Sequence, residues 1–321
     1  MVALPEQLHP MKTCRFQATV AFFLSLALSA SAATLHVDLN TPSPAPPYTN
    51  WITAATNIQD AVDVANAGDE IIVTNGVYQT GSRSADAATT NRLVIDKPVV
   101  VQSVNGAAVT LIDGGGLVRC AYLSNGARLA GFTLTNGAMS GSGGGVFLAT
   151  AVEAISNCVL IANSAGIGGG AFQGSLYNCA LIGNTAWNHG GGADSGTLNN
   201  CTLVGNTAGS GAGGGANACT LNNCIVYSNN LNYSASTLNY SCTTPLPANG
   251  AHNLTTLHNS RRPCASARVR RAAAPAVPRP PRARILMARR GRTRPPSVGT
   301  NSILPFPTSP ASARRQQPTE M

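Results

Sequence analysis

Charged residues are scarce in this chain of 321 residues, where they make up 10% of the sequence. Residues 129–260 contain no lysine or arginine, and their only acids are Glu153 and Asp194. A polysaccharide lyase needs carboxylates that hold Ca²⁺ and a basic side chain, and a glycosidase needs two carboxylates about 5 to 9.5 Å apart. The two acids stand at different positions of repeats two units apart, so we expect no catalytic pair between them.

Sequence motifs for metal binding, cofactor binding and membrane spanning are missing as well. The sequence has no Cys-x-x-Cys and no metal-ligand pairing of histidines, so we expect no metal site. The glycine runs lack the regular aspartates of calcium-binding repeats and the lysine of a phosphate loop, so we expect no cofactor. After the N-terminal segment, no apolar run approaches the length of about 20 residues that a membrane-spanning helix needs. No transmembrane helix is therefore predicted.

Glycine, asparagine and cysteine are plentiful instead, and they recur with a short period. An Asn-Cys pair returns every 21 to 23 residues, each Cys is followed five positions later by an Asn, and a triple glycine separates successive units. Such a period is typical of a solenoid, whose units bury their apolar faces only against their neighbours. The repeated positions are Cys158, Cys179, Cys201 and Cys224 with Asn163, Asn184, Asn206 and Asn229.

The units are predicted to consist of β-strands. Cys158-Val-Leu-Ile and its equivalents place Cys and then Leu or Val on one face of a strand, with a period of two. A unit of about 22 residues suits three short strands joined by turns, which is one coil of a parallel β-helix with coils about 4.8 Å apart. Before the repeats, an apolar face predicts a short helix with Asn57 as its cap, a lid over the open end of the stack. The residues of that face are Ile58, Ala61, Val62 and Ala65.

The repeat also resembles a known family. Cys-x-Leu-x-x-Asn followed by Gly-Gly-Gly-Ala is similar to bacterial secreted right-handed parallel β-helix proteins, which include polymorphic outer-membrane-protein-like and choice-of-anchor types. Residues 51–78 resemble the N-terminal segment of such proteins, and residues 131–137 resemble their first coil. The resemblance covers roughly residues 34–258 and implies export and a right-handed, all-β solenoid, a pectate-lyase-like superfold that hosts lyases, hydrolases and adhesins alike. Leu181 stands where the adhesin motif Phe-x-x-Asn has Phe.

The N-terminal residues predict export. A positively charged start at residues 11–15 precedes an apolar run at residues 18–28, and Ala-Ser-Ala at residues 30–32 offers a cleavage site before Ala33. We expect four parts: a signal peptide at 1–32 with its true start at Met11, an N-terminal segment with the capping helix at 33–69, the β-helix at 70–258 and a tail at 259–321.

The tail differs sharply in composition from the rest. The net charge of +9 divides into +1 for residues 1–32, −5 for residues 33–260 and +13 for residues 261–321. The last block holds 14 Arg and 11 Pro, which predicts disorder. A basic arm for nucleic acid is one interpretation, and a frameshift in a G+C-rich gene is the other. We favour the frameshift and expect no nucleic-acid partner, because supporting aromatic residues and an ordered motif are missing.

The cysteines and asparagines are expected to be structural. In-phase cysteines should point inward as free thiols, and replacing Cys179 with Ser should cost about 1 to 3 kcal/mol unless its hydroxyl finds a partner. The asparagines should form ladders at turns, where their side chains bond the backbone and tolerate left-handed dihedrals. A disulfide within Cys219, Cys224 and Cys242 stays open as the exception, since export permits one.

Three residues qualify as ligand contacts. Trp187 and His189 in one turn, and Tyr227 on a later strand, offer surface for a sugar ring, although packing within the protein is the alternative role for each. Asn188-His189-Gly190 is similar to a stretch of polygalacturonases, but the companion aspartates are absent, so we interpret His189 as a turn residue.

The predicted function is that of a secreted or cell-surface β-helix without catalysis. It would act as a scaffold, an adhesin or a glycan-binding rod, as a monomer outside the cell or at the outer membrane of a bacterium. Its partners would be extracellular polysaccharide or cell-surface components. The alternative is a carbohydrate-active enzyme of the pectate-lyase or polygalacturonase type.

Overall fold

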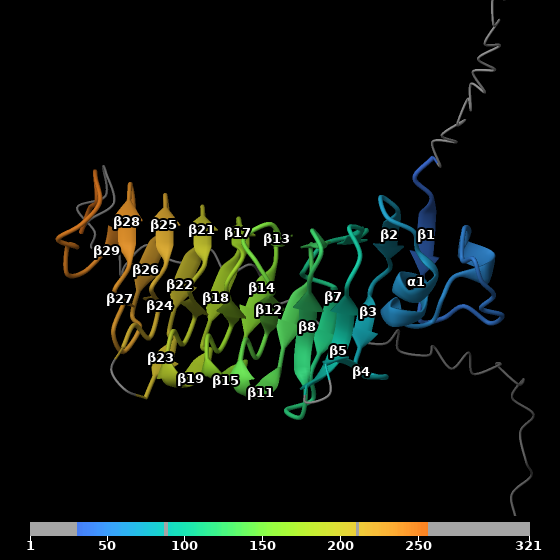
Figure 1. Cartoon of the computed structure of the whole chain (residues 1–321), viewed down its shortest axis with the longest axis horizontal. Coiled ribbons are helices and arrows are strands. Elements are labelled where there is room, and N and C mark those ends of the chain that lie inside the picture. Colours follow the sequence, from blue (N-terminus) through green and yellow to red (C-terminus); the bar gives the residue numbers. More distant parts are fainter. Residues whose placement is uncertain (1–30, 87–88, 210–211, 256–321) are drawn as a thin grey trace, which may run out of the picture. The chain divides into compact units, whose positions relative to one another are not determined.

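The computed structural model describes residues 31–86, 89–209 and 212–255. Short strands stack coil upon coil into four sheets, and the strand pairs of these segments are parallel except β4 with β5 (Figure 1). The chain is a right-handed parallel β-helix, which confirms the predicted fold class. Residues 1–30 of the predicted signal peptide, residues 256–258 of the predicted β-helix and the whole predicted tail at 259–321 lie outside the described residues.

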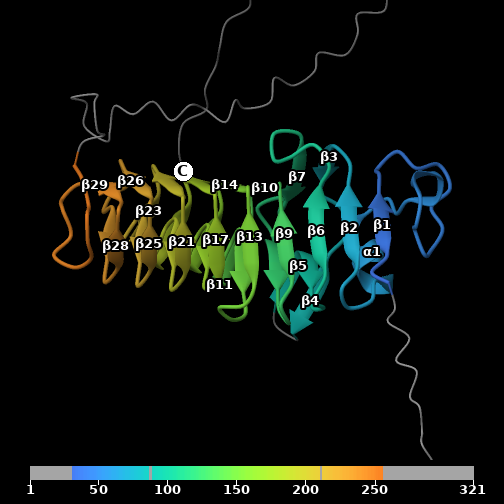
Figure 2. The ribbon, with the colours of Figure 1, turned by 90° about the horizontal axis from the view of Figure 1, so that it is seen from above.

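Sheets A and B form two walls of the coil. Sheet A has nine strands, which lie side by side in Figure 2. They are β1 Thr34–Val37, β2 Glu70–Val73, β6 Val100–Ser103, β9 Arg128–Ala130, β13 Ala154–Ser156, β17 Ser175–Tyr177, β21 Thr197–Asn199, β25 Thr220–Asn222 and β28 Thr237–Asn239. The eight strands of sheet B are β3 Gly76–Tyr78, β7 Thr110–Asp113, β10 Thr133–Thr135, β14 Val159–Ile161, β18 Ala180–Ile182, β22 Thr202–Val204, β26 Ile225–Tyr227 and β29 Cys242–Thr243.

Sheets C and D complete the coil. The eight strands of sheet C are β4 Arg83–Asp86, β5 Thr89–Ile95, β8 Arg119–Leu123, β12 Val146–Leu148, β16 Ala171–Phe172, β20 Ala193–Asp194, β24 Ala216–Asn217 and β27 Tyr233–Ser234. The four strands of sheet D are β11 Ala138–Ser142, β15 Ser164–Ile167, β19 Thr185–His189 and β23 Thr207–Ala208. The sequence predicts three strands per coil, and the strands of sheet D add a fourth strand to some of the coils. The residues of sheet D pair because the coils on either side hold them at ladder distance.

The glycine runs turn the chain from sheet D to sheet C. Gly168 opens its run with φ +62°, a left-handed conformation that favours glycine. At Gly170 a Cβ would lie 2.5 Å from the carbonyl oxygen of Gly192 in the next coil. Neighbouring coils therefore approach so closely at this corner that only glycine fits, which explains why the runs recur.

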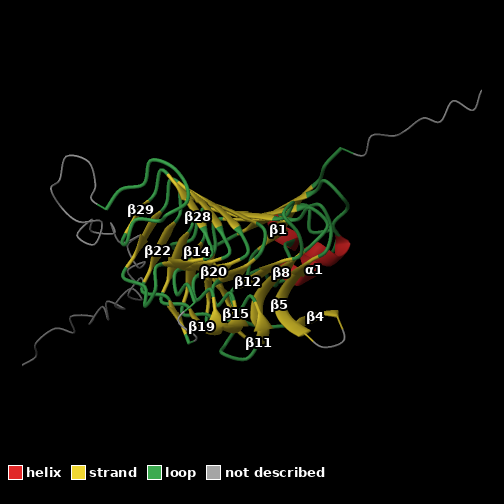
Figure 3. Ribbon diagram, turned by 60° about the vertical axis from the view of Figure 1, so that its left-hand side comes forward, coloured by secondary structure: helices red, strands yellow, loops and turns green. Residues whose placement is uncertain are grey.

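A short helix lies against the first strands. α1 spans Ile58–Val64, and Oδ1 of Asn57 accepts a hydrogen bond from N of Asp60 at 2.8 Å as its cap. Ile58, Ala61 and Val62 are buried, and Figure 3 shows the helix beside β1 at this end of the stack. At the C-terminal end of the helix, Nζ of Lys97 donates to the carbonyl oxygens of Val62 and Ala65. A 3₁₀ turn, η1 Trp51–Thr53, precedes it.

The repeated asparagines form a buried ladder inside the coil. N and Nδ2 of Asn184 both donate to Oδ1 of Asn206, at 2.9 and 3.0 Å, and Nδ2 also donates to the carbonyl oxygen of Leu160. The pattern runs from Asn163 to Asn229, where Oδ1 of Asn232 closes it. A second set of asparagines, at the turn between sheets A and B, has the left-handed dihedrals: Asn157, Asn178, Asn200 and Asn223.

The cysteines stack beside the same turn. Sγ of Cys179 is buried and donates to the carbonyl oxygen of Tyr177 at 3.2 Å. In the last described coil Ser241 takes the equivalent position, and its Oγ donates to the carbonyl oxygen of Asn239 at 2.9 Å. Cys219 and Cys224 are free thiols whereas Cys242 is disulfide-bonded, so the disulfide left open above does not form within this group of three. The free buried cysteines are Cys120, Cys158, Cys179, Cys201, Cys219 and Cys224.

Candidate functional site

The corner between sheets D and C brings a histidine and an aspartate together. His189 ends β19, Gly190 to Gly192 reverse the chain, and Asp194 ends β20. Nδ1 of His189 lies 2.6 Å from Oδ2 of Asp194. The carboxylate is buried, with 2% of Asp194 exposed, whereas about a third of the imidazole faces solvent. His189, which the sequence predicts to be a turn residue, is thus also one member of a hydrogen-bonded pair.

Asp194 has further partners that fix its orientation. Oγ of Ser195 donates to Oδ1 at 2.7 Å, and Nδ2 of Asn217 donates to Oδ2 at 2.8 Å. Asn217 occupies the same position one coil later, because β20 and β24 pair Asp194 with Asn217. Nδ2 of Asn217 also lies 3.2 Å from Nδ1 of His189. The 2.6 Å contact with the buried carboxylate favours the tautomer that carries its proton on Nδ1, in which Nε2 is the acceptor nitrogen. We call Trp187, His189, Asp194 and Asn217 the corner cluster.

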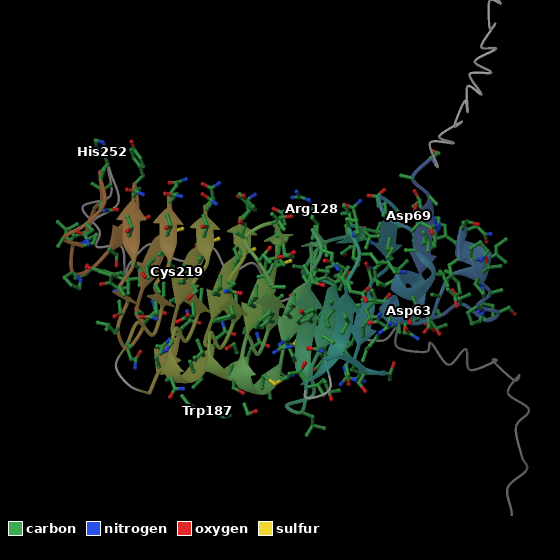
Figure 4. The ribbon with its side chains drawn as sticks, viewed as in Figure 1. Asp63, Asp69, Arg128, Trp187, Cys219 and His252 are labelled. Carbon is green, nitrogen blue, oxygen red and sulfur yellow. The ribbon has the colours of Figure 1, made fainter. Side chains whose placement is uncertain are left out.

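Trp187 is the exposed member of this cluster. It lies on β19 two positions before His189, and 57% of it is exposed. Figure 4 shows the residue at the edge formed by sheet D. Its neighbour Ala186 is buried, so alternation along the strand turns the indole outward. The corner cluster therefore offers an exposed aromatic ring on the same strand as the hydrogen-bonded imidazole.

A ladder of aromatic rings leads up to the corner cluster along sheet C. Tyr122, Phe147 and Phe172 occupy one register column, which continues into Asp194. The ring centroids are 5.4 Å apart for Tyr122 and Phe147 and 5.2 Å apart for Phe147 and Phe172, and both pairs are stacked. All three rings are half-buried.

A buried arginine supports the ladder. Cζ of Arg119 lies 5.0 Å from the centroid of Phe147 and 5.9 Å from that of Tyr122, within the range of a cation–π contact. The guanidinium also donates to Oδ1 of Asn91 at 2.6 Å and to the carbonyl oxygen of Gly143 at 2.8 Å. Arg119 therefore holds the ladder in place rather than offering a charge to a ligand.

Tyr227, the third predicted ligand contact, is not brought to this place. It lies on β26 of sheet B, paired with Val204, whereas Trp187 and His189 belong to sheet D. Glu153 is also separate from Asp194. It is buried, and its carboxylate accepts hydrogen bonds from N of Gly126 at 3.0 Å and N of Thr150 at 2.6 Å. Each of the two acids thus serves its own network.

The pKa of the buried thiols bears on their reactivity. Burial raises the pKa of Cys120 to about 12, and burial likewise raises the pKa of Cys219 to about 12. A thiol with such a pKa is protonated at neutral pH and is a poor nucleophile. The two cysteines thus fit a structural role.

Sequence reasoning missed the aromatic ladder and the His189–Asp194 pair. The sequence signal that could have revealed both features is the second residue after each glycine run. In successive units this residue is Phe147, Phe172, Asp194 and Asn217. Only the in-register stacking of coils shows that these residues share one column on the outer face.

The described residues contain neither a metal-binding cluster nor a helix that could span a membrane. Across residues 31–86, 89–209 and 212–255, no group of three or more His, Cys, Asp or Glu side chains is arranged to hold a metal ion. In the same residues, no helix is both long and apolar enough to cross a membrane.

Three solved structures with a similar fold are, by their names, a pectate lyase and two pectin methylesterases. Pectate lyase Pel9A is 12% identical with a TM-score of 0.46, over 70% of this chain and 67% of that chain. A pectin methylesterase in complex with a hexasaccharide is 11% identical with a TM-score of 0.43, over 71% of this chain and 94% of that chain. Pectin methylesterase PemA from Erwinia chrysanthemi is 13% identical with a TM-score of 0.40, over 68% and 74%. No family model matches the chain, and no curated protein matches it. The likenesses concern the β-helix fold alone.

Proposed function

We propose that this protein is an exported, non-catalytic β-helix that binds a neutral glycan along the corner between sheets C and D. The observation that carries the proposal is the exposed Trp187, which lies on β19 two positions before the hydrogen-bonded His189. An exposed aromatic ring packs against the apolar face of a sugar, while an oriented imidazole nitrogen accepts a hydrogen bond from a hydroxyl. Both features are present in the corner cluster.

The distribution of charge supports a neutral ligand. Beyond Arg128, the Asp and Glu residues of the described coils are Glu153 and Asp194, which are buried, and the same coils contain no Lys or Arg. A polyuronate would find no Lys or Arg there to pair with its carboxylates. A neutral polysaccharide, whose hydroxyls need hydrogen-bond partners and apolar contact, fits such a surface.

The aromatic ladder supports an extended ligand. Tyr122, Phe147 and Phe172 continue the outer face of sheet C over three coils before Asp194. A polymer that contacts Trp187 could follow this partly exposed apolar column, whereas a single sugar would not reach it. The proposed partner is therefore a chain of extracellular polysaccharide.

Export is part of the same proposal. It rests on the charged start, apolar run and Ala-Ser-Ala site of residues 11–32, and on the resemblance to polymorphic outer-membrane-protein-like chains. We propose that the mature protein works as a monomer outside a bacterial cell, as a scaffold or adhesin at its surface or outer membrane.

Trp187→Ala provides the direct test of glycan binding. We expect the purified protein to be retarded in gels that contain xyloglucan, galactan or mannan, and the variant to bind at least about tenfold more weakly. The matched control is Tyr177→Ala, which removes another exposed aromatic ring, on sheet A. Binding of Trp187→Ala equal to wild type, or retardation of the wild type by polygalacturonate alone, would overturn the proposal.

The His189–Asp194 pair also favours the second candidate, a carbohydrate-active enzyme. A carboxylate on Nδ1 orients an imidazole so that Nε2 can act as a general base. This candidate predicts product release from one of the same polysaccharides, lost in His189→Ala and kept in Tyr177→Ala. A wild-type protein that binds but releases no product leaves the binding function alone.

A further inference from the structure

The residue in front of the first strand contacts a buried carboxylate. N of Ala33 donates to Oδ1 of Asp69 at 2.7 Å, and 4% of Asp69 is exposed. The other oxygen, Oδ2, accepts a hydrogen bond from N of Asn66 at 2.7 Å. Among the described residues, no Lys, Arg or His side chain forms an ion pair with Asp69. A buried carboxylate is thus bonded to backbone N–H groups with no cation opposite it.

The backbone at Ala33 is held from a second side. N of Glu70 donates to the carbonyl oxygen of Ala33 at 2.9 Å, and β1 pairs with β2 from Thr34 opposite Glu70 onward. The position of the Ala33 nitrogen therefore depends on the sheet and not on the residues that precede it. Ser31 and Ala32 are exposed, so the bond between Ala32 and Ala33 is open to a peptidase.

The sequence marks the same bond for cleavage. Ala-Ser-Ala at residues 30–32 matches the small-residue pattern that precedes a signal-peptidase site. Hydrolysis of the peptide bond adds one water, leaving a carboxylate on Ala32 and an α-ammonium group on Ala33. An α-amino group has an ordinary pKa of about 7.7 to 8.0, so it carries a positive charge at neutral pH.

We propose that processing after Ala32 creates an ion pair between the new α-ammonium group of Ala33 and the carboxylate of Asp69. This inference rests on the export part of the proposed function. The cleaved group keeps the hydrogen bond at its present place and adds the missing cation, so the mature chain is more stable than its precursor. Asp69 thereby couples removal of the signal peptide to locking of β1 onto β2 at the N-terminal edge of sheet A.

The geometry selects one bond of the chain. Cleavage one residue earlier or later would move the ammonium group by about 3.3 Å along the extended strand, beyond hydrogen-bond reach of Asp69. Asp69 is labelled in Figure 4 near the start of sheet A. The mature N-terminus is accordingly Ala33, which Edman sequencing or intact-mass analysis of the exported protein identifies directly.

The test compares four proteins that all extend to residue 321. Two begin at Ala33 after removal of a fusion tag that leaves no extra residue, and two begin at Ser31, each pair with Asp69 or with Asp69→Asn. We expect the shorter wild-type chain to melt about 2 to 4 °C above the longer one, and the two Asp69→Asn chains to melt at the same temperature. An equal effect of the two extra residues in both backgrounds, or no effect in the wild type, would overturn the proposal.

A further comparison covers the case in which Asp69→Asn does not fold. Acetylation of the α-amine of the wild-type chain that begins at Ala33 removes the charge without adding residues of sequence. Its melting temperature should fall to that of the chain beginning at Ser31, and an unchanged melting temperature contradicts the ion pair. Glycan binding by Trp187 does not enter these measurements, so they fail or succeed independently of the ligand.

Discussion

Oδ1 of Asn184 accepts two hydrogen bonds from Asn163, one from its backbone N and one from its Nδ2, both at 3.0 Å. Asn184 is buried, and its Nδ2 in turn satisfies the carbonyl oxygen of Leu160. Asn184→Ala would leave these groups without partners, at about 1 to 3 kcal/mol for each stranded group. We expect the free energy of unfolding in urea to fall by at least about 2 kcal/mol.

The matched control for this variant is Asn199→Ala. Asn199 belongs to an outer ladder on sheet A, where it accepts one side-chain hydrogen bond, from Nδ2 of Asn222 at 3.1 Å. Water can replace that partner, so the loss should stay within about 0.5 kcal/mol. Similar losses for the two variants would contradict the central role of the buried ladder.

Replacement of Cys179 tests how the inward thiols are held. The sequence alone predicts that Cys179→Ser costs about 1 to 3 kcal/mol unless its hydroxyl finds a partner. In the structure the carbonyl oxygen of Tyr177 already accepts from Sγ, and Ser241 makes the same kind of contact at the equivalent position three coils later. We therefore expect Cys179→Ser to be less destabilising than Cys179→Ala, as measured by urea unfolding of the two variants side by side. The reverse order would show that the hydroxyl does not reach the carbonyl.

Gly170→Ala tests the close approach of coils at the corner between sheets D and C. The added Cβ would lie 2.5 Å from a backbone oxygen of Gly192, which cannot move without displacing a coil. We expect a loss of at least about 2 kcal/mol in stability. Gly141→Ala is the control, because the nearest atom to its Cβ is a Met139 side-chain carbon at 3.9 Å. Equal melting temperatures of the two variants would refute the steric explanation.

The coil could be predicted from sequence because its determinants repeat. Cys179 and Leu181 alternate with the period of a strand, and Asn184 returns at a fixed distance in each unit. Sheet D escaped prediction because residues such as Gly166 within β15 carry little intrinsic preference for a strand. That strand exists through pairing with β11 and β19, which local sequence does not reveal.

The corner cluster could be predicted only in part. Trp187 and His189 were recognised from residue type, since an aromatic ring and an imidazole in a polar turn are unusual in this chain. The partner Asp194 was not, because the 2.6 Å contact depends on the left-handed turn at Gly190 that carries the chain from sheet D to sheet C. The grouping of Tyr227 with them was made without knowledge of the sheets, and the structure separates it from both.

A further prediction concerns polygalacturonate. The described coils beyond Arg128 contain no Lys or Arg to act on the α-proton of a uronate, and Glu153 and Asp194 are engaged in separate networks. We expect the purified protein with Ca²⁺ to release no unsaturated products, followed by their absorbance in the ultraviolet. Calcium-dependent release of such products that His189→Ala abolishes would instead support the enzyme candidate.

The stability of the protein should depend on the ionisation of Glu153. Burial acts to raise the pKa of this carboxyl, but hydrogen bonds from Gly126 and Thr150 outweigh it and hold the pKa below the ordinary value of 4.5. A group whose pKa is lower in the folded state stabilises the fold above its unfolded pKa, and the stabilisation is lost as the pH falls through the folded pKa. Glu153→Gln should therefore be less stable than wild type at pH 7, and the difference should shrink below about pH 4.5.

Urea unfolding of both proteins between pH 7 and pH 3 measures this difference. Thr150→Ala serves as the partial variant, because it removes the hydroxyl that donates to Oε2 of Glu153 at 2.8 Å and keeps the backbone donor. Its loss of stability should be smaller than that of Glu153→Gln and should shrink over the same range of pH. A difference between Glu153→Gln and wild type that stays constant down to pH 3 would mean that the charge of Glu153 does not stabilise this turn. In that case shape and neutral hydrogen bonding alone would account for its burial.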